Sequence, residues 1–296
     1  MNNRILENPY LFAPAKVNLN LYVKGRNKNG YHNISSLVGF TEIYDVITMQ
    51  LSKSTTLELS GSEGSLIQHE KNTNIILKTI NFLQQEAKIP LQVDIKLEKN
   101  IPVAAGLGGG SADAAAVIKG ACKILGNKEL FNINDELLAG KLGSDVPVCF
   151  YGKGAWIEGY GNKLVPANEW PESWLVIANP RVPVSTRDIF SKNKNFTPEP
   201  PQKYIHLTSF QEFSDYLRGQ KNDLTPAAIA VCPVIKNVIS AIKNLPNCSL
   251  ARMSGSGPSC FGLFETQKDA TNALDILQSM QPNWWVKSTK LNFYAH

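Results

Sequence analysis

The sequence predicts an α+β protein of two domains, and three observations support that prediction. The chain has 296 residues, whereas a single domain usually has about 100–200. Period-two alternation of apolar residues appears early in the chain, and a long helical pattern follows in its middle. The second half reads strand–helix–strand–strand–helix–strand, which is the order of a ferredoxin-like domain. The predicted domains are residues 1–160 and 161–296.

The first half is predicted to contain strands followed by helices. Apolar residues at every second position predict strands over 17–23 and 93–98, because successive side chains of a strand point to opposite faces. The longest helix is predicted from apolar residues that recur on one helix face, at Ala114, Val117, Ile118, Ala121, Cys122 and Leu125. Gly126-Asn127 ends this helix, and shorter helices are predicted over 74–85 and 134–142.

Strands and helices alternate in the second half. A helix is predicted over 228–242 after the Thr225-Pro226 start, and a capping box of Thr266 and Asp269 starts another helix. The stretch 191–203, with three prolines and several lysines, is predicted to be a mobile loop. The strands are predicted over residues 174–178, 250–253, 260–264 and 284–291.

Composition excludes several classes of protein. Apolar residues make up 43% and charged residues 19% of the chain, which excludes a collagen-like, disordered or coiled-coil protein. The sequence has no run of about 18 apolar residues and no apolar core behind a basic start, so neither a transmembrane helix nor a secretory signal is expected. Five scattered cysteines without zinc-site spacing predict reduced thiols and no structural metal in a cytoplasmic protein.

The net charge of +5 suits an acidic small molecule as well as a nucleic acid. An RNA-binding role remains an alternative on charge alone. The sequence lacks the aromatic-rich pattern and the dense basic stripe that RNA-binding domains carry. A small-molecule substrate is therefore expected as partner, without nucleic acid or membrane.

The most informative stretch is the glycine-rich loop 101–113. Four glycines within five positions, 106 to 110, allow positive φ angles, so backbone N–H groups can converge on an anion. The following helix begins at or near Ser111, and its N-terminal N–H groups and dipole point back at the loop. Loop and helix together predict a phosphate-binding site, where the Ser111 hydroxyl could bond phosphate or Mg²⁺.

Three other glycine motifs do not match this loop. A P-loop needs a lysine after its last glycine, but Gly110 is followed by Ser111-Ala112. The dinucleotide pattern GxGxxG would need glycine at Ser111, and the nucleophile elbow GxSxG would need glycine at Asp113. The loop therefore indicates neither a P-loop protein, nor a dinucleotide site, nor a serine hydrolase.

Three separated motifs resemble those of the GHMP small-molecule kinases. Residues 102–111 (PVAAGLGGGS) resemble the phosphate loop, 13–19 (APAKVNL) the N-terminal motif, and 253–260 (MSGSGPSC) the C-terminal glycine motif. The motifs occur in the family's order and span most of the chain. The resemblance implies the two-domain GHMP kinase fold, with a ribosomal-S5-domain-2-like N-terminal domain and a ferredoxin-like C-terminal domain. It also implies an enzyme that uses ATP and Mg²⁺ to phosphorylate an alcohol.

Finer details resemble one branch of this family. Residues 25–32 (GRNKNGYH), 143–148 (GSDVPV) and 159–161 (GYG) are similar to the branch whose acceptor is a cytidine-diphosphate-linked methylerythritol. The resemblance implies phosphorylation of its 2-hydroxyl in the non-mevalonate route to isoprenoid precursors. A GHMP kinase for mevalonate or homoserine is the nearest alternative. A non-catalytic small-molecule sensor on the same fold is another, and it would be expected to lose the active-site lysine or aspartate.

By the resemblance, Lys16 matches the active-site lysine and Asp145 the active-site aspartate. Phosphoryl transfer depends on positioning and charge neutralisation. An aspartate that accepts the hydroxyl proton and a lysine that holds the nucleophile would supply both. The presence of both residues favours an enzyme over a sensor.

The resemblance also implies substrate-binding and nucleotide-binding residues. Asn18, on the same strand face as Lys16, is expected to bind the substrate, and Thr186 matches another substrate contact. Tyr31 and His32 match the pair that recognises cytosine. The implied ATP-binding residues are Pro102, Val103, Ala104, Ala105, Gly106, Leu107, Gly108, Gly109, Gly110, Ser111, Ala112, Asn74 and Lys99.

The metal is expected to be held mainly by ATP, without a dedicated protein site. Ser111 is a candidate contact, and Asp113 is expected to approach Mg²⁺ through water. Relatives often show two successive serines where this chain has Ser111-Ala112, so one candidate hydroxyl is missing.

Overall fold

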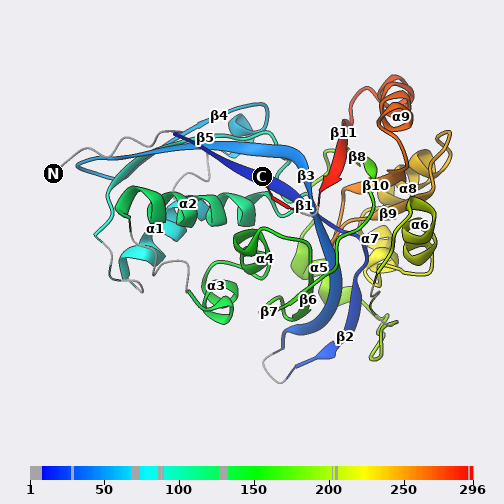
Figure 1. Cartoon of the computed structure of the whole chain (residues 1–296), viewed down its shortest axis with the longest axis horizontal. Helices are drawn as coiled ribbons and strands as arrows, with labels where there is room; N and C mark the ends of the chain where they lie inside the picture. The colour runs from blue at the N-terminus through cyan, green and yellow to red at the C-terminus, as the bar shows by residue number, and fades with distance from the viewer. Residues whose placement is uncertain are drawn as a thin grey trace.

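The chain folds into two α+β lobes whose sheets are joined by one strand (Figure 1). The structure is a computed structural model, and it describes residues 9–27, 30–67, 74–85, 88, 90–126, 133–201, 203, 206–292 and 294–295. Within these ranges, no helix is both long and apolar enough to cross a membrane.

The sheet of the first lobe is organised around one long strand, β3, which spans the 20 residues His32–Leu51. Different parts of β3 pair antiparallel with four strands, which are β1 (Tyr10–Asn18), β2 (Tyr22–Arg26), β5 (Val93–Glu98) and β6 (Ala155–Gly159). β4 (Thr56–Ser60) pairs parallel with β5, and β7 (Lys163–Pro166) pairs antiparallel with β6. The link between β1 and β2 therefore lies beside the middle of β3, where the Leu19 N–H donates to the Leu37 carbonyl at 2.8 Å.

Helices cover one face of this sheet (Figure 1). They are α1 (Ile75–Gln85), α2 (Gly109–Leu125), α3 (Asp135–Lys141) and α4 (Val146–Tyr151). α2 packs on β1 and β3, and it also contacts α1 and α4. The apolar face predicted for this helix is buried, because Ala114, Val117 and Ile118 have no exposed surface. α2 thereby holds the glycine loop at its N-terminus against the sheet.

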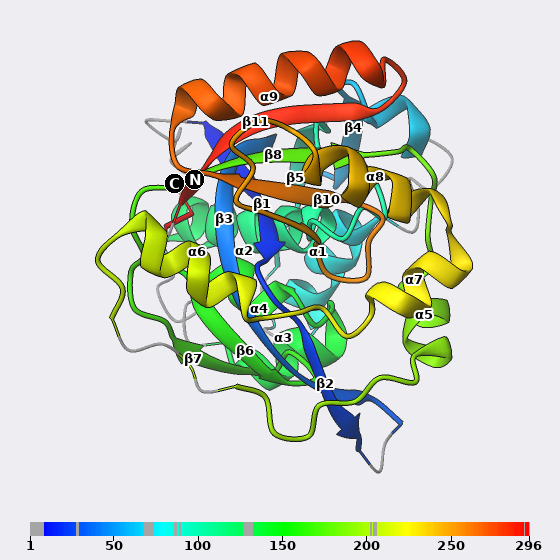
Figure 2. The same cartoon turned by 90° about the vertical axis from the view of Figure 1, so that its right-hand side faces the viewer.

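The second lobe has the ferredoxin-like arrangement that the sequence predicted. Its strands are β8 (Trp174–Asn179), β9 (Leu250–Met253), β10 (Cys260–Phe264) and β11 (Trp285–Asn292), and they pair antiparallel in the order β11-β8-β10-β9. Its helices are α5 (Thr186–Lys192), α6 (Phe210–Arg218), α7 (Thr225–Val231), α8 (Val234–Lys243) and α9 (Gln267–Met280). α8 and α9 pack against this sheet (Figure 2).

A second apolar core lies between the lobes. In β8 and β10, alternate residues face opposite sides, because strand side chains have a period of two. Val176 belongs to the core under the helices, whereas Ile177 and Phe261 belong to a separate cluster. That cluster also includes Val17 of β1 and Leu107 of the glycine loop. The second lobe therefore supports two of the parts of the chain that carry the predicted active site, which are β1 and the glycine loop.

The strand β11 joins the two sheets. Along most of its length it pairs with β8, from Trp285 to Lys290. Its last two residues pair with β3 instead, Leu291 opposite Thr41 and Asn292 opposite Phe40. The predicted boundary between residues 160 and 161 falls in the turn of the β6–β7 hairpin, and this boundary stays a prediction.

Two of the predicted elements are wrong in their extent. The strand predicted over 17–23 is interrupted after Asn18, and Asn18 and Asn20 are as buried as the apolar residues around them. The helix predicted over 228–242 is two helices, α7 and α8, separated at Cys232-Pro233. Pro233 cannot donate the backbone hydrogen bond that a continuous helix would need there.

Parts of other predictions lie outside the described residues, namely Asn127 at the end of the long helix and Gln202 in the stretch 191–203. In the described part of that stretch, Ser191 and Lys192 end α5. The Thr197 N–H donates to the Val23 carbonyl at 2.8 Å. The stretch thus has a contact with β2, and its mobility stays a prediction.

Candidate active site

A cavity of about 470 Å³ lies between the lobes at the N-terminus of α2. The first lobe contributes most of its wall, and the second lobe contributes Thr186, Phe190, Gly255 and Ser256. Of the predicted nucleotide-binding residues, the cavity is lined by Asn74, Lys99, Pro102, Val103, Ala104, Ala105, Gly106, Gly108, Gly109, Gly110 and Ser111. Leu107 and Ala112 are buried behind this wall.

The glycine loop and the first turn of α2 form a backbone cradle. α2 begins at Gly109, two residues before Ser111, and Gly108 precedes it with a φ of +65°. The Ala112 N–H donates to the Gly108 carbonyl at 2.9 Å. Amide groups at a helix N-terminus bind anions because they lack partners within the helix and lie at the positive end of its dipole. The cradle therefore fits a phosphate group.

The glycine loop is hydrogen-bonded to the C-terminal glycine motif of the second lobe. Ser254 Oγ donates to the Gly106 carbonyl at 2.9 Å, and the Ser259 N–H donates to the Ala105 carbonyl at 3.2 Å. A Cβ at Gly106 would lie 2.5 Å from the Ser254 carbonyl oxygen and 2.8 Å from that of Gly257. The two loops touch through their backbones, so residue 106 must be glycine for this contact.

Replacing Gly106 with alanine should lower the free energy of unfolding by about 1–3 kcal/mol, because a non-glycine residue at its φ of +73° is strained. The added Cβ would also push the two loops apart. Urea unfolding measures the effect. Gly110→Ala is the matched comparison, since its Cβ would meet Ile75 at 3.6 Å without strain. Equal unfolding midpoints for the two variants would contradict this account.

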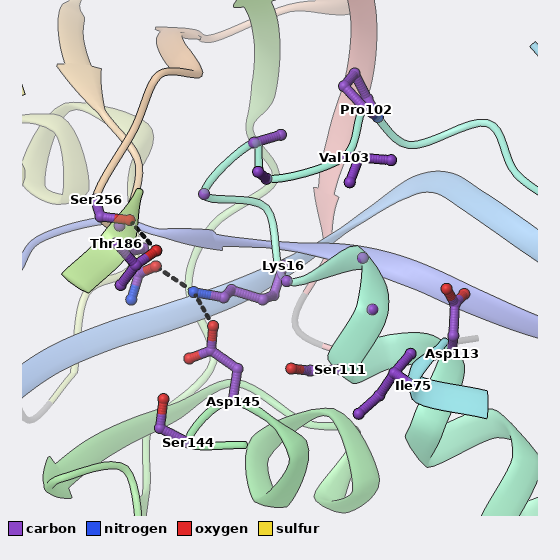
Figure 3. A pocket seen from close by; sticks show the side chains of 18 of the residues that line it. Lys16, Ile75, Pro102, Val103, Ser111, Asp113, Ser144, Asp145, Thr186 and Ser256 are labelled. Carbon is purple, nitrogen blue, oxygen red and sulfur yellow. Dashed lines mark hydrogen bonds and ion pairs between the residues drawn. The ribbon is translucent and has the colours of Figure 1, made fainter. Parts of the chain in front are cut away.

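Lys16 and Asp145 form an ion pair on the cavity wall (Figure 3). Lys16 Nζ lies 2.9 Å from Asp145 Oδ2, and the two side chains are 3% and 29% exposed. The Lys16 N–H also donates to the Leu107 carbonyl at 2.9 Å, which ties β1 to the glycine loop. Asp145 occupies the N-cap position of α4, yet its side chain makes no capping bond. The carboxylate is therefore directed at Lys16 and the cavity.

Asn18 orients Lys16 from within the protein. Its Oδ1 accepts from Lys16 Nζ at 2.5 Å, and its Nδ2 donates to Ser36 Oγ at 2.8 Å. Ser36 in turn donates to the Asn20 carbonyl. The Asn18 backbone N–H donates to Ser254 Oγ at 3.1 Å. Asn18 lines the cavity, but both atoms of its amide are already engaged, so its binding to a substrate stays a prediction.

A buried charge cluster lies beneath the glycine loop. Lys99 Nζ lies 2.5 Å from Asp45 Oδ2 and 2.6 Å from Asp113 Oδ2. Asp45 Oδ1 accepts from the N–H groups of Asn100 and Ile101 at 2.6 and 2.9 Å, so the cluster fixes the start of the loop. The Lys99 ammonium and the Asp113 carboxylate are thus bonded to each other, and both residues line the cavity; their expected roles at nucleotide and Mg²⁺ stay predictions.

Burial and the neighbouring charges shift the pKa values of Asp113 and Lys99 in this cluster. Burial raises the pKa of Asp113 to about 7, and the neighbouring Asp45 carboxylate acts in the same direction against the lowering effect of Lys99. Burial lowers the pKa of Lys99, but Asp113 and Asp45 outweigh it and raise that pKa above its usual range. A lysine held charged between two carboxylates supports the loop from below.

A second cavity, of about 900 Å³, adjoins the first. The two share Ile34, Ser144, Thr186 and Phe190, so Asp145 stands beside their junction. Tyr31 and His32 line the second cavity together with several basic side chains. These are Arg26, Lys141 and Arg187.

The two rings of the predicted pair Tyr31–His32 differ in their surroundings. Tyr31 faces solvent, whereas His32 contacts neighbouring side chains. Tyr31 is 60% exposed. His32 lies 5.0 Å from the Phe190 ring, and its Nε2 accepts from Arg26 Nε at 2.9 Å. Burial and the positive charge of Arg26 lower the pKa of His32. The imidazole is therefore neutral near pH 7, with its proton on Nδ1.

Thr186, expected to contact the substrate, lies where the two lobes meet. Its Oγ1 lies 2.9 Å from Ser256 Oγ of the C-terminal glycine loop (Figure 3). Ser185 caps α5 by accepting from the Asp188 N–H, and the helix brings Phe190, one turn after Thr186, to the same cavity. Phe190 and Ser144 were not predicted from the sequence. The four-residue spacing from Thr186 would have indicated Phe190.

The described residues include no group of three or more His, Cys, Asp or Glu side chains that could hold a metal ion. The polar groups that line the cavity include the Ser111 hydroxyl, the Lys16–Asp145 pair and the Asp113 carboxylate, beside the backbone cradle (Figure 3). Mg²⁺ readily takes most of its ligands from phosphates and water, with one or two from protein. The site therefore fits a metal that arrives with a phosphorylated ligand.

Known protein families match both lobes. Residues 74–153 match the GHMP kinases N terminal domain, and residues 202–283 match the GHMP kinases C terminal domain. The chain is 37% identical over 287 residues to the 4-diphosphocytidyl-2-C-methyl-D-erythritol kinase of Roseobacter denitrificans, covering 96% of this chain and 94% of the relative. It is 39% identical to the enzyme of the same name from Mesorhizobium japonicum, covering 94% of each chain.

Solved structures agree with these relatives. A crystal structure of 4-(cytidine 5'-diphospho)-2C-methyl-D-erythritol kinase superposes with a TM-score of 0.74 at 30% identity, covering 96% of this chain and 99% of the other. Homoserine kinase from Cytophaga hutchinsonii superposes with a TM-score of 0.68 at 19% identity, covering 99% and 97%. The second similarity is one of fold.

Proposed function

The chain belongs to the GHMP kinases and, within them, to the 4-diphosphocytidyl-2-C-methyl-D-erythritol kinases, and we propose that it transfers the γ-phosphate of ATP to the acceptor's 2-hydroxyl. It is a small-molecule kinase, and the route it serves is the non-mevalonate synthesis of isoprenoid precursors. The observation that carries the proposal is the Lys16–Asp145 ion pair beside the junction of two cavities. One cavity suits ATP and the other suits a nucleotide-linked acceptor.

The proposed role of Asp145 at this junction concerns the acceptor hydroxyl. We assign its partly exposed carboxylate the role of accepting the hydroxyl proton while the oxygen attacks the γ-phosphorus and ADP leaves. The buried ammonium of Lys16, held by Asn18 and Asp145, faces the same space. There it would stabilise the negative charge of the nucleophile and of the transferred group.

ATP is assigned to the smaller cavity. The glycine loop and the N-terminus of α2 would hold its phosphates through backbone N–H groups. Ser111 would contact Mg²⁺, which when bound neutralises phosphate charge during transfer. Lys99, Asp45 and Asp113 would support the loop from beneath, since their charges bond one another.

The larger cavity is assigned to the cytidine diphosphate of the acceptor. Tyr31 supplies an exposed aromatic face for the base, and His32 Nδ1–H can donate to a carbonyl oxygen of cytosine. Arg26, Lys141 and Arg187 bring positive charge to a cavity that would take a diphosphate. All five cysteines are free thiols, which fits the cytoplasm that we propose as its compartment.

An ADP-release assay with ATP and Mg²⁺ tests the proposal. The acceptors offered are 4-diphosphocytidyl-2-C-methyl-D-erythritol, mevalonate and homoserine. Turnover of the cytidylyl acceptor alone is expected. Turnover of mevalonate or homoserine instead would retain the kinase and overturn the acceptor assignment.

Replacing Tyr31 with alanine should raise KM for the cytidylyl acceptor about 5–150-fold, because stacking of a base on an aromatic ring contributes about 1–3 kcal/mol. The KM for ATP should stay unchanged, since Tyr31 lines the larger cavity and not the smaller one. Steady-state kinetics with each substrate varied in turn gives both values. An unchanged acceptor KM would remove Tyr31 from base recognition.

A further inference from the structure

The turn Gly159-Tyr160-Gly161 connects β6 to β7 and packs against the segment that carries Asp145. Gly161 has a φ of +104°, and a Cβ there would lie 2.3 Å from the Ser144 carbonyl oxygen and 2.8 Å from Ser144 Cβ. This backbone contact fixes the turn relative to the residue that precedes Asp145. Tyr160 sits in the middle of the turn and lines the larger cavity.

The Tyr160 ring packs on Tyr31. Their ring centroids are 5.4 Å apart at an interplanar angle of 34°. Contacts of this kind between aromatic rings are favourable at centroid separations of 4.5–7 Å. Tyr31 lies at the tip of the β2–β3 hairpin, whereas Tyr160 lies in a turn fixed on Ser144. The ring contact therefore links the hairpin tip to the Asp145 segment.

Among the described residues, the hydrogen bonds of Tyr31 are made by its backbone and not by its ring. Its N–H donates to Asn27 Oδ1 at 2.9 Å, and its carbonyl accepts from the Asn27 N–H at 2.8 Å. These bonds shape the hairpin tip through the backbone, and in the part of the chain that the structure describes the Tyr31 ring contacts the ring of Tyr160. Tyr31 is 60% exposed, so the contact with Tyr160 favours one orientation of a ring that otherwise faces solvent.

Tyr160 lies beside the first turn of α3. Glu136 in that turn lines the larger cavity together with Tyr160, and burial and the Glu136 carboxylate raise the pKa of the Tyr160 hydroxyl. Asn134 caps that helix by accepting from the Glu136 N–H at 2.6 Å, which fixes the helix start. Tyr160 is thus held by the close contact of its turn with Ser144.

We propose that Tyr160 is a positioning residue for the acceptor: it holds the Tyr31 ring in the orientation in which the cytosine base stacks on it, at a fixed distance from Asp145. The inference rests on the proposed function, because it concerns a base bound at Tyr31. Preorganising a ring lowers the cost of ordering it when the ligand binds. Tyr160 acts through Tyr31 and does not touch the reacting atoms.

The test is a double-mutant cycle of Tyr160→Ala and Tyr31→Ala, with kinetics of the wild-type reaction as reference. Tyr160→Ala should raise KM for the cytidylyl acceptor about 3–10-fold, the range expected for one aromatic pair, with kcat and the KM for ATP unchanged. In the double variant, KM should be no higher than in Tyr31→Ala, because Tyr160 acts through that ring. Tyr160→Phe keeps the ring and should recover most of the effect.

Tyr44→Ala is the matched control, because Tyr44 is also an exposed tyrosine in contact with one aromatic ring, that of Phe12 at 4.7 Å. It should leave the acceptor KM unchanged. Additive effects of Tyr160→Ala and Tyr31→Ala, or equal effects of Tyr160→Phe and Tyr160→Ala, would overturn the proposal. A wild-type protein that does not turn over the cytidylyl acceptor would instead refute the proposed function.

Discussion

Replacing Asp145 with asparagine should lower kcat about 10²–10⁴-fold, the range that a general base contributes. Asparagine has the same shape, and its amide oxygen can still accept from Lys16, but it cannot take up the hydroxyl proton. The ion pair is on the cavity wall and the carboxylate is 29% exposed, so the fold should tolerate the change. The KM for ATP should change little. Single-turnover measurement of ADP formation isolates the chemical step.

Asp215→Asn provides the comparison for that experiment. Asp215 also pairs with a basic residue, Arg218, but the pair is exposed on α6 and lines neither cavity. It should leave kcat and unfolding unchanged. If Asp145→Asn retained kcat within about tenfold, far less than removal of a base should cost, Asp145 would only orient the hydroxyl.

Replacing Lys16 with methionine should lower kcat about 10²–10³-fold, since loss of one preorganised donor at a developing charge has that effect. Methionine preserves the apolar stem that packs against Gly108, where a Cβ would lie 2.7 Å from Lys16 Cγ. The charge alone is removed. ADP release at saturating substrates measures the loss, and thermal unfolding checks that the fold survives.

Lys96→Met serves as the control for the lysine. Lys96 pairs with Glu58 at 3.2 Å, but both side chains are about two-thirds exposed, at 68% and 67%. Such a surface pair contributes little, so activity should not change. Wild-type kcat in Lys16→Met would show that the reaction does not depend on the ammonium.

The elements predicted correctly are those whose pattern is contained in a short stretch of sequence. α2 and β5 show a clear period, and β8 and β10 are short apolar runs. The predicted positions of these elements are confirmed. β3 was not predicted, although it organises the first sheet. Its segment from Leu37 to Phe40 is buried on both faces, so the apolar–polar alternation that indicates a strand is absent there.

The site was predictable where its residues are contiguous. Lys16, Asp145 and the glycine loop each lie in a motif, and the structure brings them to one cavity. Asp45 gave no signal, because an aspartate within a strand segment is ordinary until the fold places it beside Lys99. The engagement of Asn18 with Ser36 likewise depends on strand pairing. Contacts between distant segments cannot be inferred from spacing along the chain.

The position of β11 bears on how the protein is made. A growing chain folds from its N-terminus as it leaves the ribosome, so β3 is present long before the strand that completes its pairing with the second lobe. The sheet of the second lobe also waits for β11, because β8 has no partner on that side until residues 285–290 emerge. Lys16 and the glycine loop rest on the core that this sheet completes. Until residues 285–292 have left the exit tunnel, a nascent chain lacks the strand that pairs with β8 and with part of β3, and such unpaired strand edges are open to chaperones and to aggregation.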